Sequence, residues 1–528
     1  MFNWIKKSKP LSRKSYTPEA VYEKRWYILG VLCLSLLVVM IGNTSLNVAL
    51  PLLSQELRAS NSQLQWLVDS YSLVFAGFLF TAGAIGDRYG RKGIMQAGLV
   101  LFGLASAAAA FMVHSADALI AVRAVMGLAG AMIMPATLSI LTNVFPTKER
   151  ARAVGIWAGI SGAGIALGPL LTGYVLQHFT WHAVFSINIP IILIALVSGA
   201  ILVPRTSDPS HTNLDPVGAA LSIVGLVSVV YALIEAPGNG WLSPETLLIG
   251  GFGLLTMAVF VLWERRKKDQ AMLDVRLFKI PAFGISSLTL TLVFFALMGA
   301  FFSFSQLLQL VYGYSPFESA VRMLPIAFTM MIASPLSAKL VEKFGKRKVV
   351  ATGMLLVATG MFLVSLVGVT TPYIWLALSM VVMAAGMAVA MSPTTDLLMS
   401  AVPRNRAGMG SAMNDTTREL GASLGIAVLG SLLASQYTSK IAPAVSALPS
   451  TARDIAEQSL AGAMAVGRQI GGPAGLAIVK AAKESFMSGL SFSLVVGAAI
   501  VAVAAVVALV TLSPNAPHYS SKAEITDT

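Results

Sequence analysis

The strongest constraint on this chain is a series of fourteen apolar runs, most of them about 20 residues long. A run of that length crosses the hydrocarbon core of a bilayer as an α-helix, which satisfies its own backbone hydrogen bonds away from water. The chain is therefore expected to be an all-α polytopic membrane protein. The expected spans are residues 27–50, 64–85, 93–113, 118–142, 153–176, 183–203, 216–234, 245–261, 283–310, 319–340, 349–369, 373–400, 409–434 and 488–512.

Composition points to the same class. Of the 528 residues, 56% are hydrophobic and only 12% are charged, whereas soluble domains carry about 25% charged residues. The single cysteine, Cys33, lies inside the first run, so neither a disulfide framework nor a thiolate metal site is expected. The run that begins near Tyr27 is long enough to span, and we expect a retained first helix rather than a signal peptide.

Lysines and arginines orient the chain in the membrane. They collect in every second loop, and the positive-inside rule places those loops and both termini in the cytoplasm. This distribution accounts for the net charge of +13 without a nucleic-acid partner. We therefore expect the protein to lie in the cell membrane, with the lipid bilayer as its partner. The basic clusters beyond the N-terminal tail are Arg88/Arg91/Lys92, Lys148/Arg150/Arg152, Arg265/Arg266/Lys267/Lys268, Lys343/Lys346/Arg347/Lys348 and Arg404/Arg406.

An internal repeat divides the chain. Twenty-two residues separate Pro146 from Gly168, and the same number separates Pro403 from Gly425. Paired six-helix repeats with a substrate site between them are an arrangement found in membrane transporters. The expected divisions are a tail at 1–26, a six-helix bundle at 27–204, two inserted helices at 205–268, a second bundle at 269–513 and a tail at 514–528. Within the second bundle we expect a long outer loop at 435–487, holding short amphipathic helices at 451–468 and 474–487.

The run GIWAGISGAGIALGPLLTG is unusually rich in glycine for a helix. Inside a membrane, glycine lets helix backbones approach closely, and a Gly-Pro pair permits a bend. A merely well-packed helix is the alternative interpretation. The order of residues resembles the antiporter motif in the fifth helix of drug:proton exporters of the major facilitator superfamily, although that motif usually ends in Gly-Gly. The matching residues are Gly155, Gly164, Gly168, Pro169 and Gly173.

The sequence GAIGDRYGRK joins the second and third spans on the expected cytoplasmic side. Gly90 suits a tight turn, and Asp87 is placed to meet a helix N-terminus or an arginine of the other half. The basic residues alone would be a positive-inside anchor. The whole string resembles the signature loop of the major facilitator superfamily, which implies a conformational latch. The residues assigned to this latch are Gly83, Asp87, Arg88, Gly90 and Arg91.

Polar residues inside the first spans mark a candidate site. Arg123 lies about a turn and a half into the fourth span, where a charge is costly unless it snorkels to the headgroups. Asp69 lies at a similar depth in the second span and Asn43 in the outer third of the first, so the three could converge. Arg123 also resembles the arginine of the family's fourth-helix motif, which implies a role in proton transfer.

Almost the whole chain resembles the fourteen-helix drug:proton antiporters of the QacA type. This resemblance implies a proton-coupled exporter of lipophilic, cationic drugs and antiseptics, with the small-molecule substrate and protons as partners. That family has an acidic residue where this chain has Asn43, and some exporters have another where this chain is apolar near Met330. The two differences weaken any expectation of divalent substrates.

Asp415 and Glu419 lie four residues apart and share one face of their helix. At about 1.5 Å per residue, Glu419 lies near the bilayer midplane. A carboxyl group there can hold either a proton or a cationic substrate, which is the exchange that an antiporter needs. The alternative is an internal salt bridge with Arg418. Because adjacent residues point to different helix faces, Arg418 is expected to pair with Asp415 and to leave Glu419 as the main proton carrier.

Other functions have less support. The chain has no GxxxxGK[ST] phosphate loop, and its five histidines lie at span edges, in loops or in the tail. We therefore expect no enzyme, no cofactor and no metal, and a protein that functions as a monomer. A sensor or structural protein derived from a transporter is disfavoured by the intact motifs. A dedicated exporter or flippase for an endogenous lipid or metabolite stays open, because the same apolar cavity would serve it.

Two finer expectations concern the second half. Asp396, near the cytoplasmic end of its span, is expected to pair with Arg404 or Arg406. Aromatic and methionine side chains could either line an adaptable cavity or pack the bundle. These side chains are Phe301, Phe302, Phe304, Met383, Met387 and Met391, together with Gln306.

Overall fold

A computed structural model describes residues 18–46, 49, 52–53, 56–57, 61–206, 215–267, 271–403 and 406–512. The expected tail at 514–528 and most of the tail at 1–26 lie outside the described residues, as does Arg404.

The described part of the chain contains fourteen helices that are long and apolar enough to cross a membrane, which confirms the expected all-α fold. The described residues of the N-terminal half form seven helices, among which the short α7 leads directly into α8. They are α1 (Pro18–Thr44), α3 (Asn61–Tyr89), α4 (Arg91–Phe111), α5 (Ala116–Val144), α6 (Thr147–His178), α7 (His182–Ser186) and α8 (Asn188–Leu202).

Two inserted helices and the C-terminal half follow. The inserted pair is α9 (Pro216–Asn239) and α10 (Pro244–Lys267), joined to the second half by the 3-10 turn η4 (Val275–Lys279). The long helices of the second half are α11 (Pro281–Gln306) with the π-helical turn η5 (Leu307–Val311), α12 (Pro316–Phe344), α13 (Lys346–Ser365), α14 (Tyr373–Ser400), α15 (Ala407–Val445) and α18 (Gly472–Thr511).

Local signals set several helix ends. The carboxylate of Asp215 accepts a hydrogen bond from the amide of Gly218 at 3.0 Å and caps α9. Ser315 and Glu318 form a reciprocal capping box at the start of α12. Gly90 and Gly345 have φ angles of 119° and 81°, so α3 turns into α4, and α12 into α13, at a single residue.

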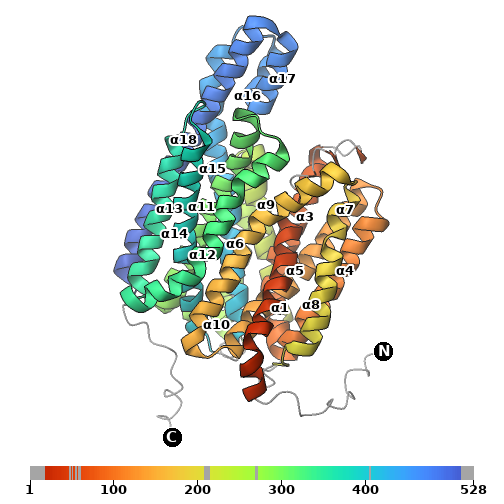
Figure 1. Cartoon of the computed structure of the whole chain (residues 1–528), viewed down its shortest axis with the longest axis vertical. Coiled ribbons are helices and arrows are strands. Elements are labelled where there is room, and N and C mark those ends of the chain that lie inside the picture. The colour runs from red at the N-terminus through yellow and green to blue at the C-terminus, as the bar shows by residue number, and fades with distance from the viewer. Residues whose placement is uncertain are drawn as a thin grey trace.

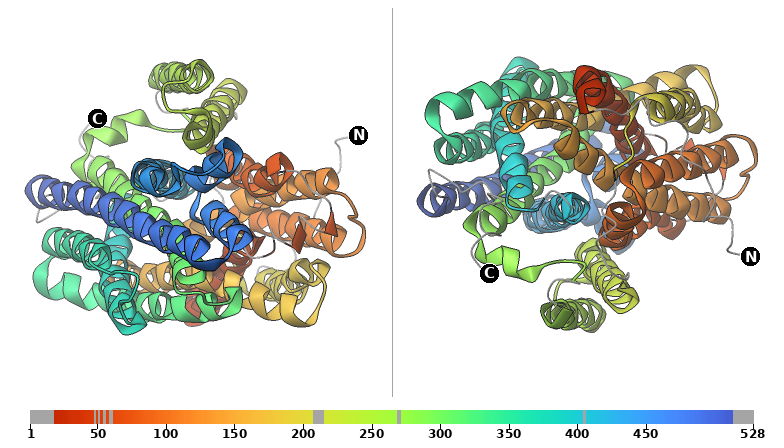
Figure 2. Two further views of the ribbon diagram at one scale, coloured as in Figure 1. Left: turned by 90° about the horizontal axis from the view of Figure 1, so that it is seen from above. Right: turned by 90° about the horizontal axis from the view of Figure 1, so that it is seen from below.

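The halves stand side by side, and the inserted pair lies outside the main body of the bundle (Figures 1 and 2). Helices α6 and α12 pack together across the halves, as do α3 and α15. Helix α9 contacts both α3 and α15, and its Val230 packs in one apolar cluster with Leu73 of α3 and Leu420 of α15. Helix α9 of the inserted pair therefore lies against the contact between α3 and α15, where the two halves meet.

The outer segment differs from the expectation. The helix expected to end at residue 434 continues to Val445, and the region expected as one helix at 451–468 is two, α16 (Ser450–Gln458) and α17 (Leu460–Ile470). Residues 474–487 are not a separate helix, because after Pro473 nothing interrupts α18 before its membrane span. The result is a helical extension that rises above the rest of the molecule in Figure 1.

Candidate transport site and latch

The carboxylate of Asp87 joins the two halves. Its Oδ1 accepts hydrogen bonds from Nε and Nη2 of Arg91, at 2.9 and 2.7 Å. The amide of Gly408 donates to Oδ1 at 2.9 Å, and that of Met409 donates to Oδ2 at 3.1 Å. Both amides lie in the first turn of α15, so a carboxylate of one half caps the positive end of a helix of the other. We call Asp87, Arg91, Gly408 and Met409 the latch, and this end of the bundle the latch end.

Glycine makes the latch possible. A Cβ atom on Gly83 would lie 2.7 Å from the carbonyl oxygen of Gly408, so only glycine lets α3 and α15 approach this closely. Gly90, at its positive φ, turns the chain so that Arg91 reaches back to Asp87. The guanidinium of Arg88 instead lies 5.2 Å from the ring centroid of Tyr89.

A second charged contact joins the halves at the latch end. Asp396 of α14 is 3.2 Å from Nε of Arg150 on α6 and 2.8 Å from Nζ of Lys346. The expected pairing of Asp396 with Arg406 is wrong, because Arg406 lies 3.9 Å from Asp274 instead. Arg150 is 246 residues away from Asp396, so no local spacing in the sequence indicates this contact.

The glycine-rich helix α6 uses its small residues on two faces. Gly155 lies against α12, where a Cβ would be 2.9 Å from the carbonyl oxygen of Ser334. The hydroxyl of Ser334 donates to the carbonyl of Gly155 at 2.7 Å. Gly164 and Gly168 face α1 of their own half, where a Cβ on Gly168 would collide with the side chain of Thr44. Helix α6 therefore touches a partner in each half.

The remaining motif positions lie toward the far end of α6. Gly173 faces Phe317 at the start of α12, where a Cβ would find ordinary contacts beginning at 3.5 Å. Pro169 lies inside the helix, which continues to His178. The motif thus spans the full length of the contact between α6 and α12.

Arg123 is fully buried and holds three helices together. Its Nε donates to the carbonyl of Leu67 in α3 at 3.0 Å, and its Nη1 donates to the carbonyl of Gly42 in α1 at 2.6 Å. The guanidinium lies 4.5 Å from the ring centroid of Tyr71. Snorkelling to the headgroups is therefore not what this side chain does in the structure.

Asp69 follows Leu67 by two residues and Asn43 follows Gly42 by one, but the hydrogen bonds of Arg123 go to the backbone carbonyls of Leu67 and Gly42 rather than to these side chains. Asp69 is half-buried on the side of α3 that meets α9. One turn earlier on α3, the ring of Trp66 packs 6.0 Å from the ring of Tyr231 of α9. Asn43 is half-buried in the last turn of α1.

Asp415 is fully buried in α15. Its Oδ1 accepts a hydrogen bond from Asn414 at 3.0 Å and lies 4.0 Å from Nη1 of Arg418, and within the described residues its Oδ2 has no hydrogen-bond partner. Arg418 lies with its guanidinium 4.9 Å from the ring of Trp157 and 4.8 Å from the ring of Phe294. The pair is thus enclosed by aromatic walls from α6 and α11.

Glu419 follows one turn after Asp415 and is half-buried rather than enclosed. It lies within electrostatic reach of Asp415 and of Tyr71. The ring of Tyr71 is the one that lies against the guanidinium of Arg123. Tyr71 of the N-terminal half and Glu419 of the C-terminal half are therefore near enough to interact electrostatically across the interface.

Sequence reasoning missed several members of this site. Tyr71, Trp157 and Phe294 supply its aromatic surfaces, and only their positions beside charged or glycine-rich motifs could have indicated them. Among the proposed lining residues, Met391 reaches the site, where its sulfur lies 3.4 Å from Nη2 of Arg418. Met383 instead packs against Gly360 of α13.

Comparison with known proteins agrees with this architecture. The sequence profile of the Major Facilitator Superfamily matches residues 32–426, and the chain belongs to this superfamily of transporters. It is 36% identical to the multidrug efflux pump LfrA of Mycolicibacterium smegmatis, over 92% of this chain and 95% of that protein. It is 32% identical to the tetracenomycin C resistance and export protein of Streptomyces glaucescens, over 94% of each chain.

Other matches extend this result. The methyl viologen resistance protein SmvA of Salmonella typhimurium is 35% identical, over 89% of this chain and 95% of that protein. Among solved structures, a bacterial homologue of the human lysosomal transporter Spinster, inward-facing and unoccupied, has a TM-score of 0.59 at 19% identity and covers 94% of this chain and 99% of that one. The protein is thus a multi-pass membrane transporter and not an enzyme.

Proposed function

We propose that this transporter exports lipophilic, cationic drugs across the cell membrane in exchange for protons. The relatives named for multidrug efflux, export or resistance support drug export. Both termini lie in the cytoplasm in this proposal, the extension at 435–487 lies outside, and a single chain is the working unit. The division into bundles 27–204 and 269–513, with inserted helices at 205–268, remains part of the proposal.

One observation carries the exchange mechanism. Asp415 has a buried carboxylate oxygen without a hydrogen-bond partner in the described residues, and the carboxyl of Glu419 lies one turn further on. A buried carboxylate without a partner is costly, and a proton or a substrate cation relieves that cost. Since the two occupants compete for the same oxygens, loading of one releases the other.

The surroundings suit a lipophilic cation. Trp157 and Phe294 face the guanidinium of Arg418, and aromatic rings of this kind also attract lipophilic cations. Glu419 is the main carrier in this scheme, because Arg418 approaches Asp415 and partly compensates its charge. Arg123 would supply positive charge on the α1–α3–α5 side of the site and favour proton release. Asp69 would attract the cation or take part in proton coupling, and Asn43 would add no charge.

The latch would control access. Asp87 and Arg91 of the latch, with Gly83, Arg88 and Gly90 of the same loop, would hold the latch end closed, and Arg150 with Asp396 would be a second contact. Opening the access path at the latch end would require both contacts to break. Helix α6, whose glycines touch α12 and α1 at backbone distance, supplies the surface on which the halves would move.

Transport in proteoliposomes tests the proposal. An imposed pH gradient should drive accumulation of a fluorescent lipophilic cation by the wild type. Glu419→Gln should insert normally but lose gradient-driven transport, Asp415→Asn should be milder, and Glu342→Gln, an exposed acid of α12, should behave as the wild type. Wild-type proton release on substrate addition in Glu419→Gln would rule out the carrier assignment.

A second arm separates the alternative function. If a fluorescent lipid analogue moves across the bilayer with the gradient and the lipophilic cation does not, the protein is a flippase or a dedicated exporter of an endogenous compound.

A further inference from the structure

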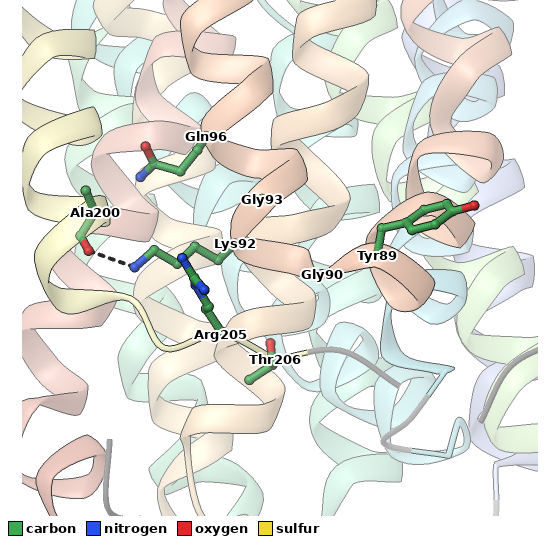
Figure 3. Close-up of a pocket in the computed structure, with 8 residues that line it drawn as sticks. All are labelled: Tyr89, Gly90, Lys92, Gly93, Gln96, Ala200, Arg205 and Thr206. Atoms are coloured by element: carbon green, nitrogen blue, oxygen red, sulfur yellow. Dashed lines mark hydrogen bonds between the residues drawn. The ribbon is translucent and has the colours of Figure 1, made fainter. Parts of the chain in front are cut away.

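A cavity of about 500 Å³ lies at the latch end, between the start of α4 and the segment that follows α8. Figure 3 shows its lining residues, which are Tyr89, Gly90, Lys92, Gly93, Gln96, Ala200, Arg205 and Thr206. None of them belongs to the candidate transport site, although Tyr89, Gly90 and Lys92 lie in the loop GAIGDRYGRK. The cavity is therefore a separate feature of the N-terminal half.

The chemistry of the cavity favours an anion. Lys92 and Arg205 line it, and its described lining includes no carboxylate. The hydroxyl of Thr206 is buried, and within the described part of the chain it has no hydrogen-bond partner. The positive end of α4 begins at the same place, without a side-chain cap on Gly90. Two cations, an unpaired hydroxyl and a helix N-terminus are the groups that hold a phosphate.

The position of the cavity favours a lipid as the source of that phosphate. The membrane spans Arg91–Phe111 and His182–Leu202 begin and end beside it, so it lies at the level of the headgroups. Lys92 and Gln96 of α4 donate hydrogen bonds to carbonyls of α8, and these bonds hold the two helices together beside the cavity. A free phosphate would need none of this alignment with the bilayer.

An exposed apolar face continues from the cavity along both helices. On α4, Val100 and Leu104 follow Gln96 at helical spacing and are 47% and 65% exposed. On α8, Val197 and Leu193 precede Ala200 at the same spacing and are 61% and 56% exposed. This surface suits an acyl chain that runs from a headgroup held at the cavity.

We propose that this cavity binds one anionic phospholipid, with its phosphate at Lys92, Arg205 and Thr206 and an acyl chain against α4 and α8. The site also touches the latch. The amide of Arg91 donates to the carbonyl of Thr206 at 3.0 Å, while the guanidinium of Arg91 holds Asp87. A lipid bound here braces the turn at Gly90 and favours the closed latch.

Native mass spectrometry of the detergent-purified full-length protein tests this proposal. Phosphatidylglycerol, phosphatidylcholine and inorganic phosphate are titrated separately. The wild type should retain one phosphatidylglycerol in preference to phosphatidylcholine. Lys92→Gln combined with Arg205→Gln should weaken this binding at least about tenfold, since two charged hydrogen bonds are lost. The matched control is Lys339→Gln combined with Lys348→Gln, which removes two exposed charges near the latch end of the other half and should bind as the wild type.

A third variant tests the cavity without removing charge. A side chain on Gly93 would meet nothing within 4 Å at its Cβ, so Gly93→Leu fills the mouth of the cavity without a clash and should also lose the lipid. The proposal fails if both double variants lose lipid equally, which would indicate diffuse surface charge. It also fails if Gly93→Leu binds as the wild type. Binding of inorganic phosphate that depends on Lys92 and Arg205, without retention of phosphatidylglycerol, would identify a free-anion site instead.

Discussion

Replacing Asp87 with asparagine should open the latch end without removing the substrate site. In the closed state the two carboxylate oxygens accept from the amides of Gly408 and Met409. Asparagine offers only one acceptor oxygen, so one of these buried amides loses its partner. The contact with Arg91 lies within one half, so it does not itself join the two halves.

The size of the effect follows from these bonds. An unpaired buried amide costs about 1–3 kcal/mol, and loss of a negative charge at a helix N-terminus costs a further ~0.3–2 kcal/mol. We take about 1.5–4 kcal/mol for the sum. The ratio of open to closed molecules should therefore rise roughly 10- to 700-fold, at about 1.4 kcal/mol per tenfold change.

Cysteine alkylation measures this ratio. Ser411 is fully buried one turn after Gly408, and its hydroxyl has no hydrogen-bond partner among the described residues, so Ser411→Cys is a mild probe. In a Cys33→Ser background, the alkylation rate of the probe by a maleimide reports the open population. Asp87→Asn should raise that rate at least about tenfold and leave equilibrium substrate affinity nearly unchanged.

The control is Glu342→Gln, which removes an exposed carboxylate from the last turns of α12 and should leave the rate unchanged. An unchanged alkylation rate in a normally inserted Asp87→Asn protein would refute the latch. Abolished substrate binding in that protein would refute it as well, because it would make Asp87 part of the substrate site.

Three further predictions follow. Arg123→Met should lower the free energy of unfolding of the detergent-solubilised protein by about 3–6 kcal/mol, since it removes two charged hydrogen bonds, to the carbonyls of Leu67 and Gly42. Arg123→Lys should lose less, and equal melting temperatures for wild type and Arg123→Met would contradict this role. Asn43→Asp should extend resistance toward divalent cations in cells that express equal amounts of protein, and unchanged resistance would disprove that account. A cysteine at Ser450 should react with an impermeant maleimide from outside the cell, and labelling only from the cytoplasmic side would reverse the proposed orientation.

The helices could be predicted from the sequence because the signals for them are local. Apolar length marks a span, and a residue such as Gly90 marks a sharp turn, wherever the rest of the chain lies. The same logic failed at residues 474–487. The break at Gly471 to Pro473 predicts a separate short helix there, whereas in the structure α18 begins at this break and continues through its span.

The partners of the charged residues could not be predicted in the same way. The sequence indicates that Arg123 could converge with Asp69 and Asn43, whereas its hydrogen bonds go to backbone carbonyls, which every residue carries and no sequence pattern marks. Asp396 pairs with Arg150 rather than with the nearby Arg406, because the fold places α6 against α14. Likewise, the sequence gives no sign of which glycines of α6 meet α12 and which meet α1.

The order of synthesis distinguishes the local partner of Asp87, which is Arg91, from its distant partners in α15. The amide of Gly408 is made 321 residues after Asp87, which corresponds to about 16–64 s of translation at roughly 5–20 residues per second. During that interval Arg91, four residues away, is already present to pair with the carboxylate as α3 and α4 enter the membrane. The local ion pair can thus form first during biogenesis. The hydrogen bonds to α15 can form only later, once the second half has been made and packs against the first.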